Sequence, residues 1–350
     1  MKEFEDGLTP KSTTKCTKWS VKIYEKYARS SNNQYLTLDD LKNLQPATLN
    51  EVLREFYFLM RTEDGNFYKP VSLRSVRAGI RRALLASLQP YPHDIIESQH
   101  FITSNKMLET MAKKYMTEPT ATKTQHKPSI TEEDLVKIGI FAETAARNPT
   151  TLLYLVWFYL AYYYGQRGCE KWPEYKVSDL EFSEDSKGKF VVLSKTRMIQ
   201  SKTHQGGLTS SSLDDSIMPH IYEDPTDPVD PYKTFHLYIQ KIDLEEGEDC
   251  RLFLTPNTKT QMNPSSVWYH KKKPMGINKI SQILPEISKL ADLSQRYTNQ
   301  SVRATTITQL RRMGNSREKV KMITKHKSTE IMTVYEDQIL LEQYLKCTDY

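Results

Sequence analysis

The segment 151–165, TLLYLVWFYLAYYYG, is the most apolar stretch of this 350-residue chain. It is too short to span a bilayer, which takes about 20 apolar residues in a helix, and it contains five tyrosines. A helix that is apolar on all sides is buried in the centre of a domain. We therefore predict a buried helix at 150–164, around which one domain of the chain is built.

The composition is typical of an ordered, soluble chain, with 38% hydrophobic and 26% charged residues. The length is sufficient for two domains. A net charge of +6 permits a polyanionic partner but does not require one. The four cysteines form no C-x-x-C pair, which indicates a reducing compartment and neither a zinc site nor a disulfide framework. The N-terminal residues lack the apolar core of a signal peptide, and we expect no membrane association.

Helix-start signals and apolar periodicity predict four helices in the first third of the chain, near 15–29, 48–62, 72–88 and 103–116. Capping-box patterns begin at Thr37 and Thr48. Within the third helix, apolar residues recur at helical spacing and predict a core-facing stripe. Its members are Leu73, Val76, Ile80, Leu84 and Leu88.

An arginine stripe runs beside that apolar stripe on the same predicted helix. It comprises Arg74, Arg77 and Arg81, supplemented by Arg82, and Lys69 precedes it. No aspartate or glutamate occurs from position 65 to position 93, whereas a typical surface intersperses opposite charges. Two interpretations stay open: a solvated helix face, or a surface that tracks the phosphates of a nucleic acid.

A polar segment with two prolines separates the two predicted domains. We place a helical domain at 1–120, a linker at 121–128 and a second domain at 129–350.

In the second domain, a helix-start signal at Thr131 precedes the buried helix. Alternation over 179–202 then predicts a hairpin about a Ser-Lys-Gly-Lys turn. A helix near 231–242, a short strand at 251–256 (RLFLTP) and helices to the end of the chain follow. The predicted fold class is mainly α with a small antiparallel β-sheet.

Basic and nucleophilic residues lie in four separated parts of the second domain. In chain order they are Arg167, which has glycines on both sides; Lys195 and Lys202, on the predicted hairpin; Arg303, in an acid-free interval with five arginines; and His326, nine residues before Tyr335. Each alone has an ordinary explanation: arginines pair with helix ends, hairpin lysines are solvated, and a histidine or tyrosine on a helix packs.

Together and in this order, these residues resemble the tyrosine recombinase family. The family pattern is an arginine, a hairpin lysine, [His/Lys]-x-x-Arg, and a histidine or tryptophan nine residues before the nucleophilic tyrosine. The resemblance sharpens towards the branch carried by Crypton DNA transposons and extends from about residue 15 to residue 340. The segments that carry it are FYKPVSLRSVRAGIRRALL, RGCE, KTHQGG, DPVDPYKTFHLYIQK and WYHKKKPMG…YTNQSVRAT.

The resemblance implies a helical core-binding domain and a catalytic domain that close on duplex DNA as a C-shaped clamp. It also implies that Tyr335 is a nucleophile that forms a 3′-phosphotyrosine link. This link conserves the bond energy, so no ATP is needed. The sequence contains no cluster of metal ligands and no Walker-type glycine loop, so neither a cofactor nor a metal is expected. Arg167 and Arg303 suit a clamp on the phosphate oxygens, because a guanidinium binds phosphate bidentately and stays charged.

The resemblance assigns two further roles in the catalytic domain. His326 donates a further hydrogen bond to the phosphate. Lys202 protonates the leaving 5′-oxygen as general acid, with Lys195 as the alternative.

One position departs from the family pattern. Gln300 stands three residues before Arg303, where the family usually has histidine or lysine. Glutamine can hydrogen-bond a phosphate but cannot titrate or carry charge. The first hypothesis is a site-specific recombinase, the transposase of a Crypton-like element. The alternatives are a domesticated, catalytically weak or silent DNA-binding protein, and an enzyme that relaxes supercoils by the same covalent chemistry.

Double-stranded DNA is the expected partner, contacted by the arginine stripe together with Lys69 and Lys195. The resemblance implies a homo-oligomer on DNA, from dimer to tetramer. The last segment, QILLEQYLKC at 338–347, is expected either to dock on a neighbouring copy or to pack within its own domain. The expected location is the nucleus.

Overall fold

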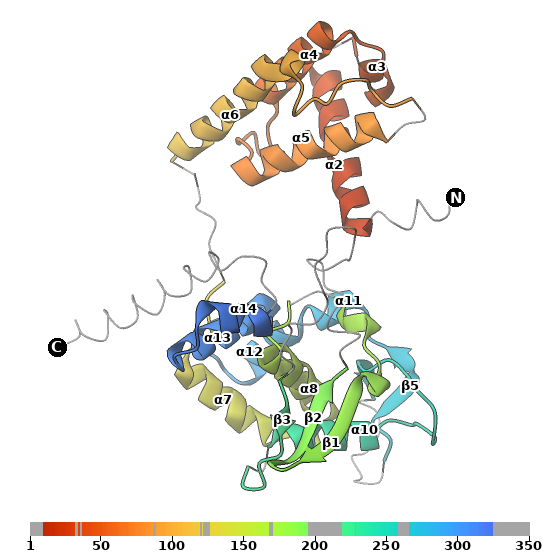
Figure 1. Cartoon of the computed structure of the whole chain (residues 1–350), viewed down its shortest axis with the longest axis vertical. Coiled ribbons are helices and arrows are strands. Elements are labelled where there is room, and N and C mark those ends of the chain that lie inside the picture. The colour runs from red at the N-terminus through yellow and green to blue at the C-terminus, as the bar shows by residue number, and fades with distance from the viewer. Residues whose placement is uncertain are drawn as a thin grey trace, which may run out of the picture. The chain divides into compact units, whose positions relative to one another are not determined.

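The computed structural model describes residues 10–31, 34–35, 37–86, 89–119, 121, 127–167, 171–194, 219–227, 229–257 and 266–324. Contacts divide the chain into two compact units, Met1–Gln125 and His126–Tyr350, which we call unit 1 and unit 2 (Figure 1). The division lies within the segment predicted as a linker. The functions assigned to the two domains stay predictions, as does the C-shaped clamp, which concerns how the units sit together.

Helices form the regular structure of unit 1 in its described residues. They are α2 (Lys11–Ser30), α3 (Leu38–Lys42), α4 (Pro46–Leu59), α5 (Pro70–Leu85) and α6 (Ile102–Thr117), with a 3-10 turn, η1 (Gln99–Phe101), before α6. α2 packs against α5, and α4 packs against α6. In the core the rings of Tyr24 and Phe56 meet edge to face, with their centroids 5.3 Å apart.

The apolar stripe predicted on α5 is confirmed in the described residues. Leu73, Val76, Ile80 and Leu84 are buried, whereas Leu88 lies outside those residues. Their spacing of three or four residues places them on one side of the helix, where they enter the core of unit 1.

Of the two predicted capping boxes, only the one at Thr37 is correct. The Thr37 hydroxyl accepts a hydrogen bond from the Asp40 N–H at 3.2 Å, and the Asp40 carboxylate accepts one from the Thr37 N–H at 2.7 Å. At Thr48 the prediction is wrong, because α4 begins earlier, at Pro46. A proline at the first helical position already has a helical φ and has no N–H to satisfy, so the helix starts there.

Unit 2 is organised around α8 (Pro149–Tyr163), the buried helix predicted from the apolar segment. The Asn148 side chain caps it by accepting hydrogen bonds from the N–H groups of the first turn. It contacts α7 (Glu132–Ala142), α10 (Pro231–Gln240), α12 (Ile283–Leu290) and α13 (Asn299–Arg312), so helices cover several of its sides (Figure 1). The other described helices and turns are α11 (Ile277–Ile280), α14 (Arg317–Thr324), η2 (Ala145–Arg147), η3 (Trp172–Glu174) and η4 (Val177–Asp179).

Two small antiparallel sheets complete the described part of unit 2. The first has the strand order β1 (Leu180–Asp185), β2 (Gly188–Leu193), β3 (Ile221–Tyr222), and the second pairs β4 (Leu254–Pro256) with β5 (Tyr269–Pro274). β1 and β2 are the predicted hairpin, and β4 lies in the predicted RLFLTP strand. The prediction that helices alone follow β4 is wrong, because β5 is a strand. Its sequence, YHKKKP, has too few apolar residues to show a strand pattern.

The predicted fold class is confirmed: the chain is mostly helical with small antiparallel sheets. None of the helices in the described part of the chain has the length and apolar character that crossing a bilayer requires.

A buried carboxylate joins the start of α7 to the segment that leads into α13. Asp134 accepts hydrogen bonds from the Ser294 N–H at 2.9 Å, from the Tyr297 hydroxyl at 2.8 Å and from the Ser294 hydroxyl. Burial raises the pKa of Asp134, but these hydrogen bonds outweigh it and hold the pKa below its ordinary value. The stabilisation is therefore present at neutral pH and is lost as the pH falls through the lowered pKa.

Helices α2 and α5 approach each other closely at Gly79 of α5. A Cβ atom at this position would lie far inside contact distance of the Ser20 side chain on α2. The Ser20 hydroxyl also donates to the Cys16 carbonyl at 2.9 Å, which holds it in place. The absence of a side chain at Gly79 therefore sets the distance between the two helices.

Replacing Gly79 with alanine is predicted to destabilise unit 1 by about 1–3 kcal/mol, because the new methyl group collides with Ser20. Gly139→Ala is the matched control, since Gly139 lies within α7 and a Cβ there meets nothing within 4 Å. The control should gain about 0.5–1 kcal/mol from helix propensity. The measurement is the free energy of unfolding in denaturant; equal effects of the two variants would contradict the close approach.

Candidate active site

The end of α8 turns the chain sharply just before Arg167. Gly165 has a φ of +54°, the left-handed conformation that favours glycine. Its N–H donates to the Tyr162 carbonyl at 3.4 Å, and the Gln166 N–H donates to the Ala161 carbonyl at 3.1 Å. This pair of hydrogen bonds is a Schellman motif with glycine at the C′ position. The glycine preceding Arg167 in the sequence therefore ends α8 and directs the chain towards that arginine.

Gly165 also contacts the last described turn of the chain. A Cβ atom at this position would lie 2.9 Å from Cγ2 of Thr324 and 3.6 Å from Cγ2 of Thr306. Thr324 ends α14 in the described residues, two positions before His326 in the sequence. The segments that lead to Arg167 and to His326 are therefore in contact.

The guanidinium of Arg303 joins the same two segments. Its Nη1 donates to the Gly165 carbonyl, and its Nη2 donates to the Thr324 carbonyl at 2.6 Å. Arg303 is half-buried on α13, so its position is defined by contacts on both sides. Gly165, Arg303 and Thr324 thus meet in one place, and in the sequence Gly165 lies two residues before Arg167 and Thr324 two residues before His326.

Hydroxylic side chains, together with the buried Val302, hold α13 against α8 and the neighbouring segments. The Thr306 hydroxyl donates to the Tyr162 carbonyl at 2.7 Å, near the C-terminal end of α8. The Thr305 hydroxyl accepts a hydrogen bond from the Ile130 N–H at 2.8 Å and donates to the Ser301 carbonyl. These buried hydroxyl groups are paired with backbone, which lets a polar sequence fill a buried helix.

Gln300 and Arg303 lie on one face of α13, because side chains three residues apart on a helix are neighbours. Gln300 is exposed. An exposed amide beside the half-buried guanidinium can donate and accept hydrogen bonds but cannot exchange a proton with a substrate.

Arg167 is half-buried, and its carbonyl accepts a hydrogen bond from Nε1 of Trp172 at 2.9 Å. The other predicted site residues lie outside the described residues: Lys195, Lys202, His326 and Tyr335. No group of three or more histidine, cysteine, aspartate or glutamate side chains within the described ranges is arranged to hold a metal ion.

Two contacts at the site were not predicted from the sequence. Thr324 meets Gly165, and the Tyr164 hydroxyl accepts a hydrogen bond from the Leu193 N–H at 2.8 Å, which links the end of α8 to the end of β2. No local signal distinguishes Tyr164 from the other tyrosines of the apolar segment. Both contacts join residues far apart in the chain, so a single sequence gives no pattern for them.

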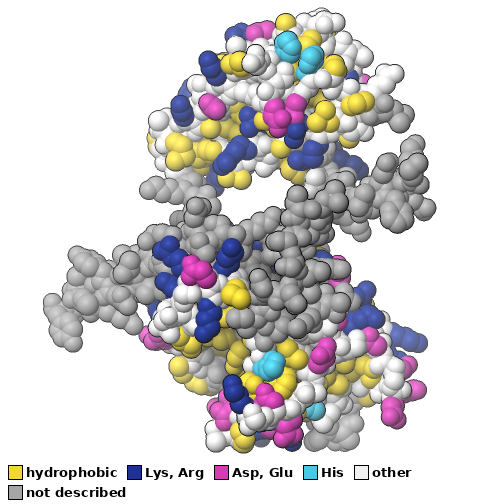
Figure 2. Space-filling view, viewed as in Figure 1, with side chains coloured by type: hydrophobic (Ala, Val, Ile, Leu, Met, Phe, Trp, Pro, Cys, Tyr) yellow, Lys and Arg dark blue, Asp and Glu magenta, His cyan; other side chains and the backbone are white. Residues whose placement is uncertain are grey.

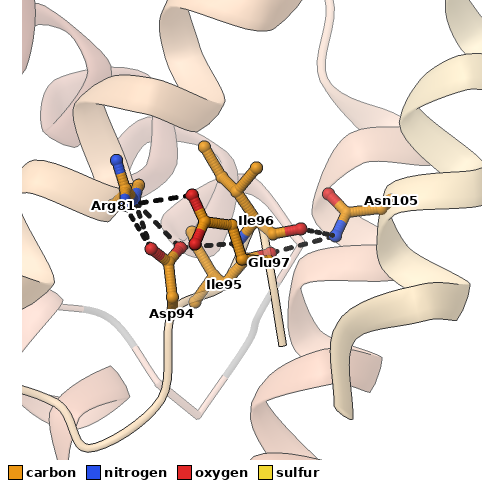
Figure 3. A network of polar contacts seen from close by, with 6 residues as sticks. All are labelled: Arg81, Asp94, Ile95, Ile96, Glu97 and Asn105. Carbon is orange, nitrogen blue, oxygen red and sulfur yellow. Dashed lines mark hydrogen bonds and ion pairs between the residues drawn. The ribbon is translucent and has the colours of Figure 1, made fainter. Parts of the chain in front are cut away.

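In unit 1, the arginines predicted to contact DNA differ in their surroundings. Nε of Arg81 donates to the two carboxylate oxygens of Asp94 at 2.9 and 2.7 Å, and Glu97 lies 3.8 Å from its guanidinium (Figure 3). These hydrogen bonds lower the pKa of Asp94 and raise the pKa of Arg81, so the pair stays ionised at neutral pH. Arg81 therefore fastens the 94–97 segment to α5.

The other arginines of the stripe range from bonded to exposed. Arg77 donates to the Asn105 side chain at 2.8 Å, and Arg82 donates to the Thr17 hydroxyl at 2.9 Å. Arg74 and Lys69 are exposed. On the face of unit 1 seen in Figure 2, basic side chains lie among acidic, apolar and uncharged ones. Within the stripe, Arg74 is the arginine whose side chain is most accessible to a ligand.

Replacing Gly165 with alanine is predicted to cost more stability than replacing Gly314. Gly314 ends α13 in the same motif, with a φ of +79°, and a Cβ there meets nothing within 4 Å. Gly314→Ala should cost about 1 kcal/mol for the left-handed backbone alone. Gly165→Ala should cost about 1–3 kcal/mol more, because its methyl group meets Thr324.

Denaturant unfolding of both variants measures this difference. Thr324→Ser removes the contacted methyl group, so the double variant Gly165→Ala with Thr324→Ser should recover the excess cost. Equal costs at the two glycines would contradict the contact between α8 and α14.

No family model matches the chain. It is 22% identical over 288 residues to the uncharacterized protein KIAA1958 of Homo sapiens and to its homolog in Mus musculus. These matches cover 81% of this chain and 38% of each relative, so the chain spans well under half of the length of these relatives.

Among solved structures, the chain is similar to the Tn1549 transposon integrase in complex with transposon right end DNA, at a TM-score of 0.51 and 12% identity, over 97% of this chain and 96% of that one. It also matches the XerA recombinase at a TM-score of 0.39 and 14% identity, over 95% and 99% of the two chains. At these identities the likeness shows the fold alone, which is similar to that of the Tn1549 transposon integrase.

Proposed function

We propose that this chain is a site-specific tyrosine recombinase of a Crypton-like element, which cuts and rejoins duplex DNA through a covalent link to Tyr335. The observation that carries the proposal is the position of Arg303. Its guanidinium bonds the carbonyls of Gly165 and Thr324, the residues that lead to Arg167 and His326. A fold shared with a transposon integrase supports the proposal.

The proposed reaction needs positive charge around one phosphate. Arg167 and Arg303 neutralise the non-bridging oxygens as charge builds up in the transition state. The hydroxyl of Tyr335 loses its proton to water, and its oxygen forms a bond to phosphorus. The bond from phosphorus to the 5′-oxygen breaks, and Lys202 gives that oxygen a proton. His326 and Gln300 donate hydrogen bonds to the phosphate. The 5′-hydroxyl of a second duplex then reverses the steps and completes the exchange.

The proposed substrate is double-stranded DNA. The Tn1549 integrase structure is a complex with transposon right end DNA, which supports this partner. Exchange between two duplexes needs more than one protein copy, so we propose a dimer to tetramer on DNA. For a protein that acts on chromosomal DNA in a nucleated cell, the corresponding location is the nucleus.

A second candidate is a DNA-binding protein that no longer cleaves. The observation that favours it is Gln300, which occupies the exposed face of α13 beside Arg303 with a group that cannot titrate. In that case the arginines would still bind phosphate, but acid and base catalysis at this position would be absent. The two candidates differ in one observable, the covalent adduct.

The predicted result for the proposed function is a covalent adduct between the chain and nicked DNA. The substrate is a pool of short duplexes with randomised centres and a nick in one strand. Cleavage close to the nick releases a short fragment, so the 5′-hydroxyl is lost and the adduct accumulates. Denaturing electrophoresis detects the adduct, and sequencing of the attached strand gives the recognised site and the cleaved bond.

Tyr335→Phe should abolish the adduct, because phenylalanine has no oxygen to form the bond to phosphorus. Tyr344→Phe, in the same C-terminal region, is the matched control and should leave the adduct intact. Wild-type protein that binds duplex from the pool but never forms an adduct would refute the recombinase proposal and favour the second candidate.

A further prediction separates two arginines of α5 that lie seven residues apart. Arg74→Ala should weaken binding to a fluorescent duplex of arbitrary sequence and reduce the slope of log affinity against log salt by about 1. Arg81→Ala should leave the slope almost unchanged but lower the melting temperature of unit 1, because Asp94 loses its partner. If Arg81→Ala lowered the slope and Arg74→Ala did not, Arg81 would be the arginine that contacts DNA, and the prediction would be wrong.

A further inference from the structure

Tyr164 lies one residue beyond the end of α8, and its ring is 2% exposed. Its hydroxyl accepts a hydrogen bond from the N–H of Leu193, the last residue of β2, at 2.8 Å. In the described residues, β3 pairs with β2 at Phe190 and Val191, short of Leu193. The phenol therefore holds β2 at a point beyond the reach of that strand.

Tyr164 also directly precedes the segment 165–167, which ends at Arg167. Tyr164 is the C-cap residue of α8, the carbonyl of the next residue, Gly165, bonds Arg303, and Arg167 follows three positions after Tyr164. The side chain of Tyr164 thus accepts a hydrogen bond from the β1–β2 hairpin. Its backbone continues into the segment that contacts Arg303 and contains Arg167. This buried side chain therefore couples these two parts of unit 2.

We propose that Tyr164 is a positioning residue for the lysine that acts as general acid, a role that rests on the proposed function. Covalent connectivity places Lys195 two residues and Lys202 nine residues after Leu193. The hydrogen bond from Leu193 to Tyr164 joins the end of β2, where Leu193 also pairs with Leu180 of β1, to the segment that leads to Arg167. Together with that pairing, it sets the point from which the chain continues to either lysine.

The chemistry of the leaving group provides a test specific to this role. When phosphorus is transferred to Tyr335, the 5′-oxygen leaves as a strongly basic alkoxide unless a proton reaches it. A sulfur atom in the same bridging position leaves as a thiolate, and thiols have a pKa of only about 8.5. Breaking the phosphorus–sulfur bond therefore needs no general acid. A defect in positioning the acid should disappear on the sulfur substrate.

Tyr164→Phe keeps the buried ring and deletes the oxygen that accepts the hydrogen bond. The probe is the duplex recovered from the nicked pool, synthesised with oxygen or with sulfur at the 5′-bridging position of the cleaved bond. On the oxygen duplex, we expect the rate of adduct formation at saturating protein to fall roughly 10- to 100-fold, with Kd unchanged. On the sulfur duplex, the variant should be as fast as wild-type protein.

Tyr159→Phe is the matched control. Tyr159 also lies on α8, and its hydroxyl donates to the Val229 carbonyl at 2.9 Å instead of bonding the hairpin. Any effect of this variant should be the same on both duplexes, because it perturbs α8 without releasing β2. The control therefore measures what the loss of one phenolic hydroxyl from this helix does by itself.

Two results would overturn the inference while leaving the recombinase proposal in place. Tyr164→Phe could be slow to the same degree on both duplexes, which would make Tyr164 a general structural residue. It could also match wild-type protein on the oxygen duplex. Absence of an adduct with wild-type protein on either duplex would instead refute the proposed function itself, and the inference with it.

Discussion

One guanidinium, that of Arg303, is shared by the carbonyls of Gly165 and Thr324, and the arrangement of the candidate site depends on it. Carbonyl groups at the end of a helix carry partial negative charge and lack partners within the helix. Gly165 lies just past the end of α8, so a cation there is stabilised by the helix end as well as by the hydrogen bond. The arginine proposed to bind substrate also has a structural role in the folded chain.

Holding that arginine requires α13 to be buried although its sequence is polar. Thr305 and Thr306 achieve this by directing their hydroxyl groups to backbone groups of neighbouring segments. Asp134 of α7 also holds the segment that precedes α13, by accepting hydrogen bonds from Ser294 and Tyr297. Each of these bonds satisfies a buried polar group, and together they favour the orientation of α13 that directs Arg303 at Gly165, just past the end of α8.

Sequence patterns predict the parts of this fold that depend on local periodicity. The buried α8, the stripe from Leu73 to Leu84 and the β1–β2 hairpin follow from apolar spacing and turn residues. Elements without such a pattern were missed or misplaced: β5 is rich in lysine, and Pro46 starts α4 ahead of Thr48. The acid-free interval of the sequence also did not reveal that Arg81 has an acidic partner. Asp94, to which Arg81 donates hydrogen bonds, lies just past the end of that interval.

At the candidate site, sequence order predicts roles for Arg167 and Arg303, and these roles stay predictions. It does not predict the contacts at Gly165, two residues before Arg167, one of which is with Arg303. Those contacts are made by a carbonyl and a methyl group, which carry no recognisable motif. The predicted residues that lie outside the described part of the chain, Lys195, Lys202, His326 and Tyr335, stay predictions.

The hydrogen bond between Leu193 and Tyr164 also completes the pairing of backbone groups at the end of β2. In the described residues β3 pairs with β2 at Phe190 and Val191 and does not reach Leu193. Leu193 and Tyr164 are both buried, and a buried N–H without an acceptor costs about 1–3 kcal/mol. The phenol therefore does for this residue what a neighbouring strand does elsewhere in a sheet.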